Sequence, residues 1–336
     1  MVKPGVFSEK KRSIFSIPPY HSLLKPLITA ICGSDIQYYR GEKSSEKLKL
    51  RLPLILLHEG VCLDLITGKR VVPVAGDFRN VPSNFIGKEN LWPELPYMGA
   101  SMPGLARTSF IYSQELLLPV PDEIPNETAS LVEPTSIAIK SLKEMNINAN
   151  DKVAIIGTGG MAFLMMLILA KFANIPKANL YIFGINNDKL KYFQNFAQII
   201  NYEESDLLGL RSHFTAVLEA VGRTHINTTL NLAFKLIRPG GKIGILGISH
   251  LSLALPSNQL VNQRIEVKGL TRSTYADYIS AIEFIKTNSI STIIKNDIIY
   301  PGKFLITSTK DLRQAFEFAD SKKSHGRILL EWPTII

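Results

Sequence analysis

The sequence has only two cysteines, Cys32 and Cys62, in 336 residues. Two cysteines cannot build a disulfide framework, and such sparse use is typical of a reducing compartment. The longest apolar run, residues 161–170, is about half of what a membrane span of ~20 residues needs. The first residues, MVKPGVFSEKKRSIF, lack the apolar core of a secretion signal. We therefore expect a cytoplasmic protein with no membrane partner.

A basic arm and an aromatic RNA-binding signature are also missing, although the formal net charge is +9. The lysines are scattered, so only the charge itself favours nucleic acid, and we expect no nucleic-acid partner. A basic surface attracts other anions equally well, including phosphorylated metabolites. Apolar residues make up 46% of the chain, which is enough for a sizeable core, and the length suits two domains.

The composition and the secondary-structure pattern of the chain change near residue 125. Residues 1–125 are rich in proline and glycine and predict a β-rich domain, whereas residues 126–270 alternate strand and helix patterns, as parallel doubly wound sheets do. Residues 271–336 contain two helical patterns and a closing strand, and we expect them to rejoin the first domain. The runs that carry this reading are LKPLITAI, LPLILL, KRVVPVA and ELLLPVP, then KVAIIG, NLYIFG, TAVLEAVG and GKIGILG, and finally YADYISAIEFIKT, LRQAFEFADSKK and GRILLEW.

A glycine motif follows the strand KVAIIG and opens an apolar helix. Its residues are Gly157, Gly159, Gly160 and Ala162, in the pattern G-x-G-x-x-A. Gly157 permits a tight turn, Gly159 lets the backbone approach a pyrophosphate, and Ala162 allows close packing of helix on strand. Free N–H groups at the helix N-terminus then bind the phosphates. The complete strand–turn–helix context predicts dinucleotide binding.

The end of the next strand distinguishes NADP from NAD. An acidic residue there would bind the ribose 2′-hydroxyl of NAD, but this strand ends in Gly184. Asn186 and Asn187 follow, and Lys189 and Lys191 could meet a 2′-phosphate. Asp188 is placed to begin the next helix. We expect NADP(H) to be preferred over NAD(H).

A possible metal site is spread along the chain. Cys32 lies in CGSD, His58 and Glu59 in LHEG, and Glu133 in LVEP at the domain junction. Each residue alone is ordinary, because a lone cysteine or histidine is most often a core residue. Together they provide a thiolate, an imidazole and carboxylates, which is the donor set of a catalytic zinc with one open position.

The ordered set of motifs resembles the zinc-dependent medium-chain dehydrogenase/reductase superfamily over essentially the whole chain. The matching features are ICGSD, LHEG, LVEP, GTGGMA, EAVG, RPGGKIGILG and Arg272. The resemblance implies a GroES-like catalytic domain (1–125, joined by 271–336) and a Rossmann NADP-binding domain (126–270). It makes Cys32, His58 and Glu133 the zinc ligands, with Glu59 as an exchanging or indirect ligand. Further implied roles are orientation of His58 by Asp35, proton relay by Ser34 and cofactor-phosphate binding by Arg272.

Two departures from the superfamily pattern stand out. The region from Gly76 to Pro103 lacks the four cysteines of a structural zinc lobe, so we expect one catalytic zinc and no structural zinc. The glycine that usually precedes the His-Glu pair is replaced by Leu57. Within the superfamily the chain is more similar to the NADPH-dependent ribulose-5-phosphate reductases, through ICGSDIQYYRG, LPLILLHEGV, YIFGINNDKLKYF, GLTRS and GRILLEW. Residues 76–110, which include part of the substrate wall, match less clearly.

The resemblance implies an enzyme that reduces ribulose 5-phosphate to ribitol 5-phosphate and acts as a homo-oligomer, a dimer or tetramer. Arg40 and Lys43 follow the zinc cysteine and are candidates to bind a substrate phosphate, with Arg107 a weaker one. Two alternatives remain open. A dehydrogenase of an unphosphorylated polyol or sugar, of the sorbitol or glucose type, would share every motif. A non-catalytic NADPH-binding protein would be expected to have lost the zinc set, which this sequence retains.

Overall fold

The computed structural model describes residues 1–321 and 326–333 and forms two compact units. Unit 1 comprises Met1–Ser136 and Ser273–Ile336, and unit 2 comprises Ile137–Arg272. The sequence placed the first boundary at residue 125. The difference arises because helix α3 (Asn126–Ala129) and the first turn of α4 (Val132–Met145) lie in unit 1. Among the described residues, no helix has the length and apolarity needed to cross a bilayer.

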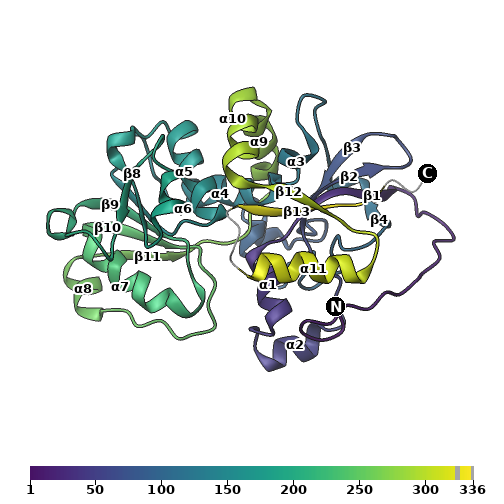
Figure 1. The fold of residues 1–336 in the computed structure, drawn as a ribbon, viewed down its shortest axis with the longest axis horizontal. Helices are drawn as coiled ribbons and strands as arrows, with labels where there is room; N and C mark the ends of the chain where they lie inside the picture. The colour runs from purple at the N-terminus through teal and green to yellow at the C-terminus, as the bar shows by residue number, and fades with distance from the viewer. Residues whose placement is uncertain (322–325, 334–336) are drawn as a thin grey trace. The chain divides into compact units, whose positions relative to one another are not determined.

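A seven-stranded sheet forms the framework of unit 1, in the order β12-β13-β1-β2-β3-β5 with β4 also paired to β1. Strand β13, near the end of the chain, pairs antiparallel with β1, with Ala30 opposite Leu329 (Figure 1). The last segment thus lies in the same sheet as the first. The strands are β1 (His21–Ala30), β2 (Glu59–Asp64), β3 (Arg70–Pro73), β4 (Phe110–Ser113), β5 (Leu117–Pro119), β12 (Ile299–Leu305) and β13 (Arg327–Glu331).

Two parts of unit 1 differ from the expected β-rich pattern. Helices α1 (Gly33–Arg40) and α2 (Ser45–Arg51) occupy a region in which strands and little helix were expected. The run LPLILL is not a strand, because its carbonyls accept hydrogen bonds from a loop, for example from Leu105 N to Leu57 O at 2.9 Å. The other helices of unit 1 are α9 (Tyr275–Lys286), α10 (Asn288–Ile293) and α11 (Thr309–Asp320), with short helical turns at Ser83–Phe85, Glu89–Leu91, Gln114–Leu116 and Ile294–Ile298.

Unit 2 is a parallel six-stranded sheet in the order β11-β10-β9-β6-β7-β8. When these strands are numbered one to six along the chain and listed from β8 to β11, their order is 3-2-1-4-5-6, as in a Rossmann fold. This order confirms the predicted α/β fold class. Helix α5 packs on β6 and β7, and α7 packs on β9. The elements are β6 (Val153–Ile156), α5 (Gly160–Lys171), β7 (Leu180–Gly184), α6 (Asn187–Lys191), β8 (Gln198–Asn201), β9 (Phe214–Glu219), α7 (Ile226–Leu236), β10 (Ile237–Ile245), α8 (Ser257–Asn262) and β11 (Glu266–Gly269), with short turns at Lys177–Asn179, Leu208–Leu210 and Arg223–His225.

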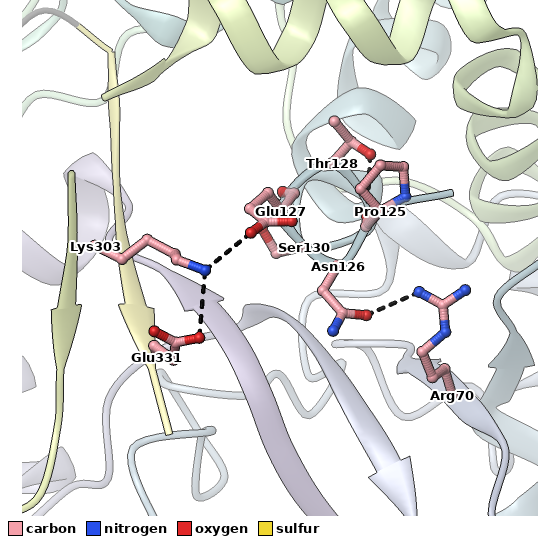
Figure 2. A network of polar contacts seen from close by, with 8 residues as sticks. All are labelled: Arg70, Pro125, Asn126, Glu127, Thr128, Ser130, Lys303 and Glu331. Carbon is pink, nitrogen blue, oxygen red and sulfur yellow. Dashed lines mark hydrogen bonds and ion pairs between the residues drawn. The ribbon is translucent and has the colours of Figure 1, made fainter. Parts of the chain in front are cut away.

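A polar network fixes the segment that leads into α4 (Figure 2). Arg70 donates to Asn126 Oδ1 at 2.9 Å and to three backbone carbonyls just before α3. Lys303 donates to Glu127 at 2.9 Å and to Glu331 at 3.3 Å. These contacts attach α3 to strands β3, β12 and β13, and so they hold in place the helix that begins one turn later.

Candidate active site

Three of the predicted ligands lie together in unit 1. One ligand atom from each of Cys32, His58 and Glu59 lies within 4.8 Å of the others, and no second group of this kind occurs in the described parts of the chain. Cys32 directly precedes α1, His58 directly precedes β2, and Glu59 is the first residue of β2. Strands β1 and β2 pair so that Ala30 is opposite Glu59, which brings the two ligand segments to one edge of the sheet.

Asp35 connects the two ligand segments. Its Oδ2 accepts a hydrogen bond from Cys32 N at 3.0 Å, and its Oδ1 accepts one from Leu57 N at 3.0 Å. The same Oδ1 lies 3.9 Å from Nδ1 of His58. The predicted orientation of His58 by Asp35 therefore has a geometric basis, and the carboxylate also fixes the backbone on both sides of the site.

Leu57 explains why a glycine is usual before the His-Glu pair. Its φ is +75°, in the left-handed region that glycine tolerates best. Gly99 and Gly104 pack on its backbone, and a Cβ at Gly104 would lie 2.1 Å from Leu57 O. Leu57 is fully buried, so packing and the bond to Asp35 maintain this conformation. The left-handed turn directs the next residue, His58, toward Cys32.

Glu59 is a buried carboxylate without hydrogen bonds. Its side chain is 0% exposed, and neither oxygen has a hydrogen-bond partner among the described residues. Its charge is compensated by Arg327 on β13, whose Nη1 lies 3.1 Å from Oε1. The sequence reading included Arg327 in GRILLEW but gave it no role. Only strand pairing brings it to the site.

Glu133 is held by an aromatic partner instead. Tyr97 donates a hydrogen bond of 2.6 Å from its hydroxyl to Oε1 of Glu133, and both side chains are buried. Tyr97 also hydrogen-bonds with Tyr278, whose hydroxyl accepts from Ala75 N at 3.2 Å. Glu133 is outside the three-residue cluster, although its charge acts on His58. The direct ligation by Glu133 predicted from the sequence stays a prediction.

The cluster is strongly polarised. Burial alone would raise the pKa of Cys32, but the hydrogen bond with His58 and the charge of Arg327 hold this pKa well below its usual range. Burial alone would lower the pKa of His58, but Asp35 and Cys32 raise it well above its usual range. A hydrogen bond from Ser34 also favours the thiolate. These surroundings therefore favour the deprotonated sulfur of Cys32, which is the form that binds a metal.

These residues fit a zinc ion. A thiolate and an imidazole are the nitrogen and sulfur ligands that zinc prefers, and a carboxylate with two unsatisfied buried oxygens completes a three-residue set. Burial raises the pKa of Glu59 more than Arg327 lowers it, so a bound cation would stabilise the ionised form further than Arg327 alone does.

The glycine motif of unit 2 has the geometry of a phosphate-binding turn. Gly157 has a φ of +129°, and a Cβ there would lie 3.1 Å from Val221 Cγ2. A Cβ at Gly159 would meet nothing within 4 Å, and Gly159 caps α5 without a side-chain hydrogen bond. Gly160 begins α5 and Ala162 is fully buried within it. The first N–H groups of this 12-residue helix thus face an open space that suits a pyrophosphate.

The polar residues after β7 differ in whether their side chains already have partners. Asn186 caps α6 by accepting from Lys189 N at 2.9 Å, and Lys191 pairs with Asp188 at 2.9 Å. The Lys189 ammonium has no ion pair among the described residues and is only partly exposed. Gly184 is buried, and a Cβ there would lie 2.6 Å from Thr158 Cγ2. Arg272, the last residue of unit 2, is half-buried with a φ of +55°.

The predicted phosphate-binding residues differ in their surroundings. Arg40 pairs with Asp320 and Glu42, so its charge is compensated. Arg107 lies over the Phe110 ring, 4.1 Å from the centroid, and burial lowers its pKa to about 10. Lys43 is half-buried beside α1. The charge of Cys32 affects the pKa of Lys43. The pKa of Arg107 is affected by Cys62 and by none of the three cluster residues.

Comparison with known proteins identifies a family match largely in the second half of the chain and a closely similar fold. Residues 164–287 match the zinc-binding dehydrogenase family model. The structure resembles that of S. aureus TarJ in complex with NADPH, with a TM-score of 0.81 and 22% identity over 99% of this chain and 98% of that one. The likeness shows the fold, and the matched residues lie in the dinucleotide-binding part of the chain and the helix that follows it.

The similar proteins include enzymes whose names state a substrate. The chain is 25% identical to ribulose-5-phosphate reductase 1 of Staphylococcus aureus over 92% of this chain and 91% of the relative. It is 23% identical to sorbitol dehydrogenase 1 of Saccharomyces cerevisiae over 94% and 92%, respectively. These findings confirm the predicted resemblance to the medium-chain dehydrogenase/reductase superfamily and to its ribulose-5-phosphate reductases.

Proposed function

We propose that this protein is a zinc-dependent reductase that uses NADPH to convert ribulose 5-phosphate to ribitol 5-phosphate. The observation that carries the proposal is the buried cluster of Cys32, His58 and Glu59 in a chain that resembles ribulose-5-phosphate reductase 1 along 92% of its length. The glycine turn after β6 supplies the second requirement, a site for a dinucleotide.

The bound groups supply Lewis acidity (zinc) and a hydride (NADPH). The residues of unit 1 do the rest. Cys32, His58 and Glu59 would hold the metal, and Asp35 keeps the two ligand segments in register. The hydroxyl of Ser34 would relay a proton from solvent to the oxygen of the reduced carbonyl. Ser34 is suited to this role because it hydrogen-bonds to Cys32 and is partly exposed.

We assign the metal carboxylate to Glu59 in preference to Glu133. Glu59 belongs to the compact cluster and its oxygens lack hydrogen bonds, whereas Oε1 of Glu133 is already bonded to Tyr97. Glu133 then contributes a second, oriented carboxylate beside His58. This assignment exchanges the roles that the resemblance implied for the two glutamates. It retains one catalytic zinc and no structural zinc.

The preference for NADPH rests on Gly184 and Lys189. The absence of a carboxylate at the end of β7 leaves the 2′-phosphate unopposed, and Lys189 provides an uncompensated ammonium in the following helix. Asn186 contributes through its helix cap, which fixes the backbone of Lys189. Lys191 is less suited because Asp188 neutralises it.

An unphosphorylated polyol is the second candidate substrate, because the chain is also similar to sorbitol dehydrogenase 1. Steady-state assays with ribulose 5-phosphate, ribulose, fructose and sorbitol, each with both cofactors, distinguish the two. We expect the highest kcat/KM for ribulose 5-phosphate with NADPH. Equal efficiency on ribulose and ribulose 5-phosphate would favour the polyol alternative, and no turnover of any of these by zinc-loaded protein would contradict both.

Three expectations about context remain predictions: a homo-oligomer, a cytoplasmic location and no nucleic-acid partner. Exposed apolar side chains in unit 2 agree with the first, because Leu251, Leu253 and Leu255 are each about 40% exposed in one short segment. Light scattering of the purified protein measures the oligomeric state directly.

A further inference from the structure

Lys43 differs from Arg40, the other basic residue at the end of α1, in forming no ion pair with a carboxylate among the described residues. Arg40, only three positions earlier, forms ion pairs with Glu42 and Asp320. Lys43 forms no ion pair in residues 1–321 and 326–333, although it is half-buried. Its ammonium donates to Oε1 of Gln37 and lies 5.3 Å from the centroid of the Tyr38 ring. Both of these neighbours are neutral, and the carboxylates of Asp35 and Glu42 act on Lys43 only from beyond ion-pair distance.

In these surroundings the ammonium of Lys43 can still bind an anion. Burial removes water from the ammonium and lowers the pKa of Lys43. An amide oxygen and an aromatic face stabilise the charge without neutralising it. A phosphate that reached Lys43 would give its ammonium a charged acceptor in place of the neutral amide oxygen of Gln37. Hydrogen bonds between two ionised groups are stronger than those to a neutral acceptor.

The position of Lys43 is tied to the cluster through α1. This helix begins directly after Cys32, and Gln37 and Tyr38 lie three and four residues after Ser34. Residues with this spacing share one face of a helix, about one turn or 5.4 Å apart along the axis. Lys43 is held against that face by Gln37 and Tyr38, and the charge of Cys32 acts on it.

We propose that Lys43, positioned by Gln37 and Tyr38, binds the phosphate of the substrate while Ser34 and the Cys32 cluster act on its carbonyl. The proposal rests on the proposed function and adds the residue that selects a phosphorylated ketose. A ketopentose 5-phosphate has its carbonyl at C2 and its phosphate on C5, so its two ends are separated by a few bonds, comparable to one helical turn. Arg40 is excluded from this role because two carboxylates already engage it.

Lys43→Met tests the assignment, with Lys49→Met as a matched control. Lys49 is exposed on α2, so its loss changes the net charge equally without removing a partly buried cation. Lys47 is unsuitable as a control because its charge acts on Lys43. We expect Lys43→Met to lower kcat/KM for ribulose 5-phosphate by roughly 10- to 100-fold, the effect of losing one charged hydrogen bond. Its kcat/KM for unphosphorylated ribulose should stay within about twofold of the wild type, by the same reasoning. Lys43→Arg should restore much of the lost efficiency.

A second measurement avoids dependence on one variant. Inorganic phosphate should inhibit the wild type competitively against ribulose 5-phosphate, and Lys43→Gln should weaken this inhibition while Lys49→Gln should not. Equal losses on both substrates, or no loss on either, would overturn the assignment of Lys43 and leave the reductase proposal intact. A wild-type enzyme that fails to reduce ribulose 5-phosphate would overturn the proposed function, and the assignment of Lys43 with it.

Discussion

Arg327 and Glu59 form an ion pair of 3.1 Å in which the side chains are 9% and 0% exposed. The arginine comes from β13 and the glutamate from β2, which lie on opposite sides of β1 in the same sheet. Arg327 also donates to the carbonyl of Ile31 at 3.4 Å, next to Cys32. One guanidinium thus contacts both segments that supply the cluster.

Arg327→Met should destabilise the metal-free protein by about 3–5 kcal/mol, because breaking a buried pair leaves an uncompensated carboxylate. Zinc should restore part of the loss, since the ion replaces the missing positive charge beside Glu59. Thermal unfolding with and without zinc measures both effects. The double variant Glu59→Gln/Arg327→Met removes both charges and should be more stable than Arg327→Met alone. A double variant that is no more stable would contradict the ion-pair explanation.

Asp35→Asn should weaken zinc binding by roughly 10- to 100-fold, as changes next to metal ligands often do. One oxygen becomes an NH₂ group, which faces the N–H of Cys32 or Leu57 and cannot accept from it. Competition with a chelator measures the affinity. NADPH binding should be unchanged because the glycine turn lies in unit 2. Asp206→Asn, an exposed change, serves as the control, and an equal effect in both variants would exclude a specific role for Asp35.

Cys32→Ser and Cys62→Ala separate the two thiols. Cys32→Ser should abolish both zinc retention and turnover, because a serine hydroxyl does not replace the thiolate as a ligand. Cys62 is buried on β2 and burial raises the pKa of its thiol, so Cys62→Ala should retain one zinc per chain. Metal analysis of the purified variants decides this, and NADPH titration should give similar affinities for both. Two zinc ions per wild-type chain would contradict the single-site prediction.

The cofactor preference should be reversible at the end of β7. Gly184→Asp alone is a poor test, because its Cβ would lie 2.6 Å from Thr158 Cγ2. Thr158→Ser removes that methyl group, and the remaining close contact, 3.2 Å to Leu190 Cδ2, requires only a small shift of that side chain. Thr158→Ser/Gly184→Asp should therefore fold and place a carboxylate where it repels the 2′-phosphate. The ratio of kcat/KM for NADPH over NADH should fall by at least about tenfold relative to Thr158→Ser. An unchanged ratio would place the 2′-phosphate elsewhere.

Lys303 gives a stability effect with a defined pH dependence. Burial alone would raise the pKa of Glu127, but the hydrogen bond from Lys303 lowers it below its ordinary value of 4.5. A lowered carboxyl pKa stabilises the fold above that value, and the contribution is lost as pH falls through the lower pKa of the folded state. Lys303→Met should therefore cost about 0.5–1 kcal/mol at pH 7, since the pair is partly exposed, and little near pH 3. Lys310→Met, exposed and unpaired in the described chain, should cost little at either pH when Tm is measured.

The sequence predicted the features that depend on local pattern. The glycine turn could be identified because its strand, turn and helix are contiguous, and the cluster because its motifs occur in a recognisable order. Arg327 and Tyr97 could not be identified in this way. Each acts on a glutamate far along the chain, and the proximity follows from the pairing of β13 with β1 and from the packing of residue 97 against α4.

Helices α1 and α2 were missed for a different reason. Both are short, and α1 lacks the regular apolar spacing that predicts a longer helix. Signals were nevertheless present at their first residues. Asp35 stands three positions after the cap of α1, and Ser44 caps α2 by accepting from Lys47 N at 3.3 Å. Capping residues would have predicted these helices where periodicity did not.

The discontinuity of unit 1 has a consequence for biosynthesis. Cys32, His58 and Glu59 leave the ribosome early, but β13, which brings Arg327 to Glu59, is made after the whole of unit 2. Domains generally fold as units during synthesis, so the continuous stretch 137–272 can form its sheet while the ligand segments still lack their closing strand. Metal loading on the nascent chain would therefore meet an incomplete site, and the final site is assembled only after unit 2 has been synthesised.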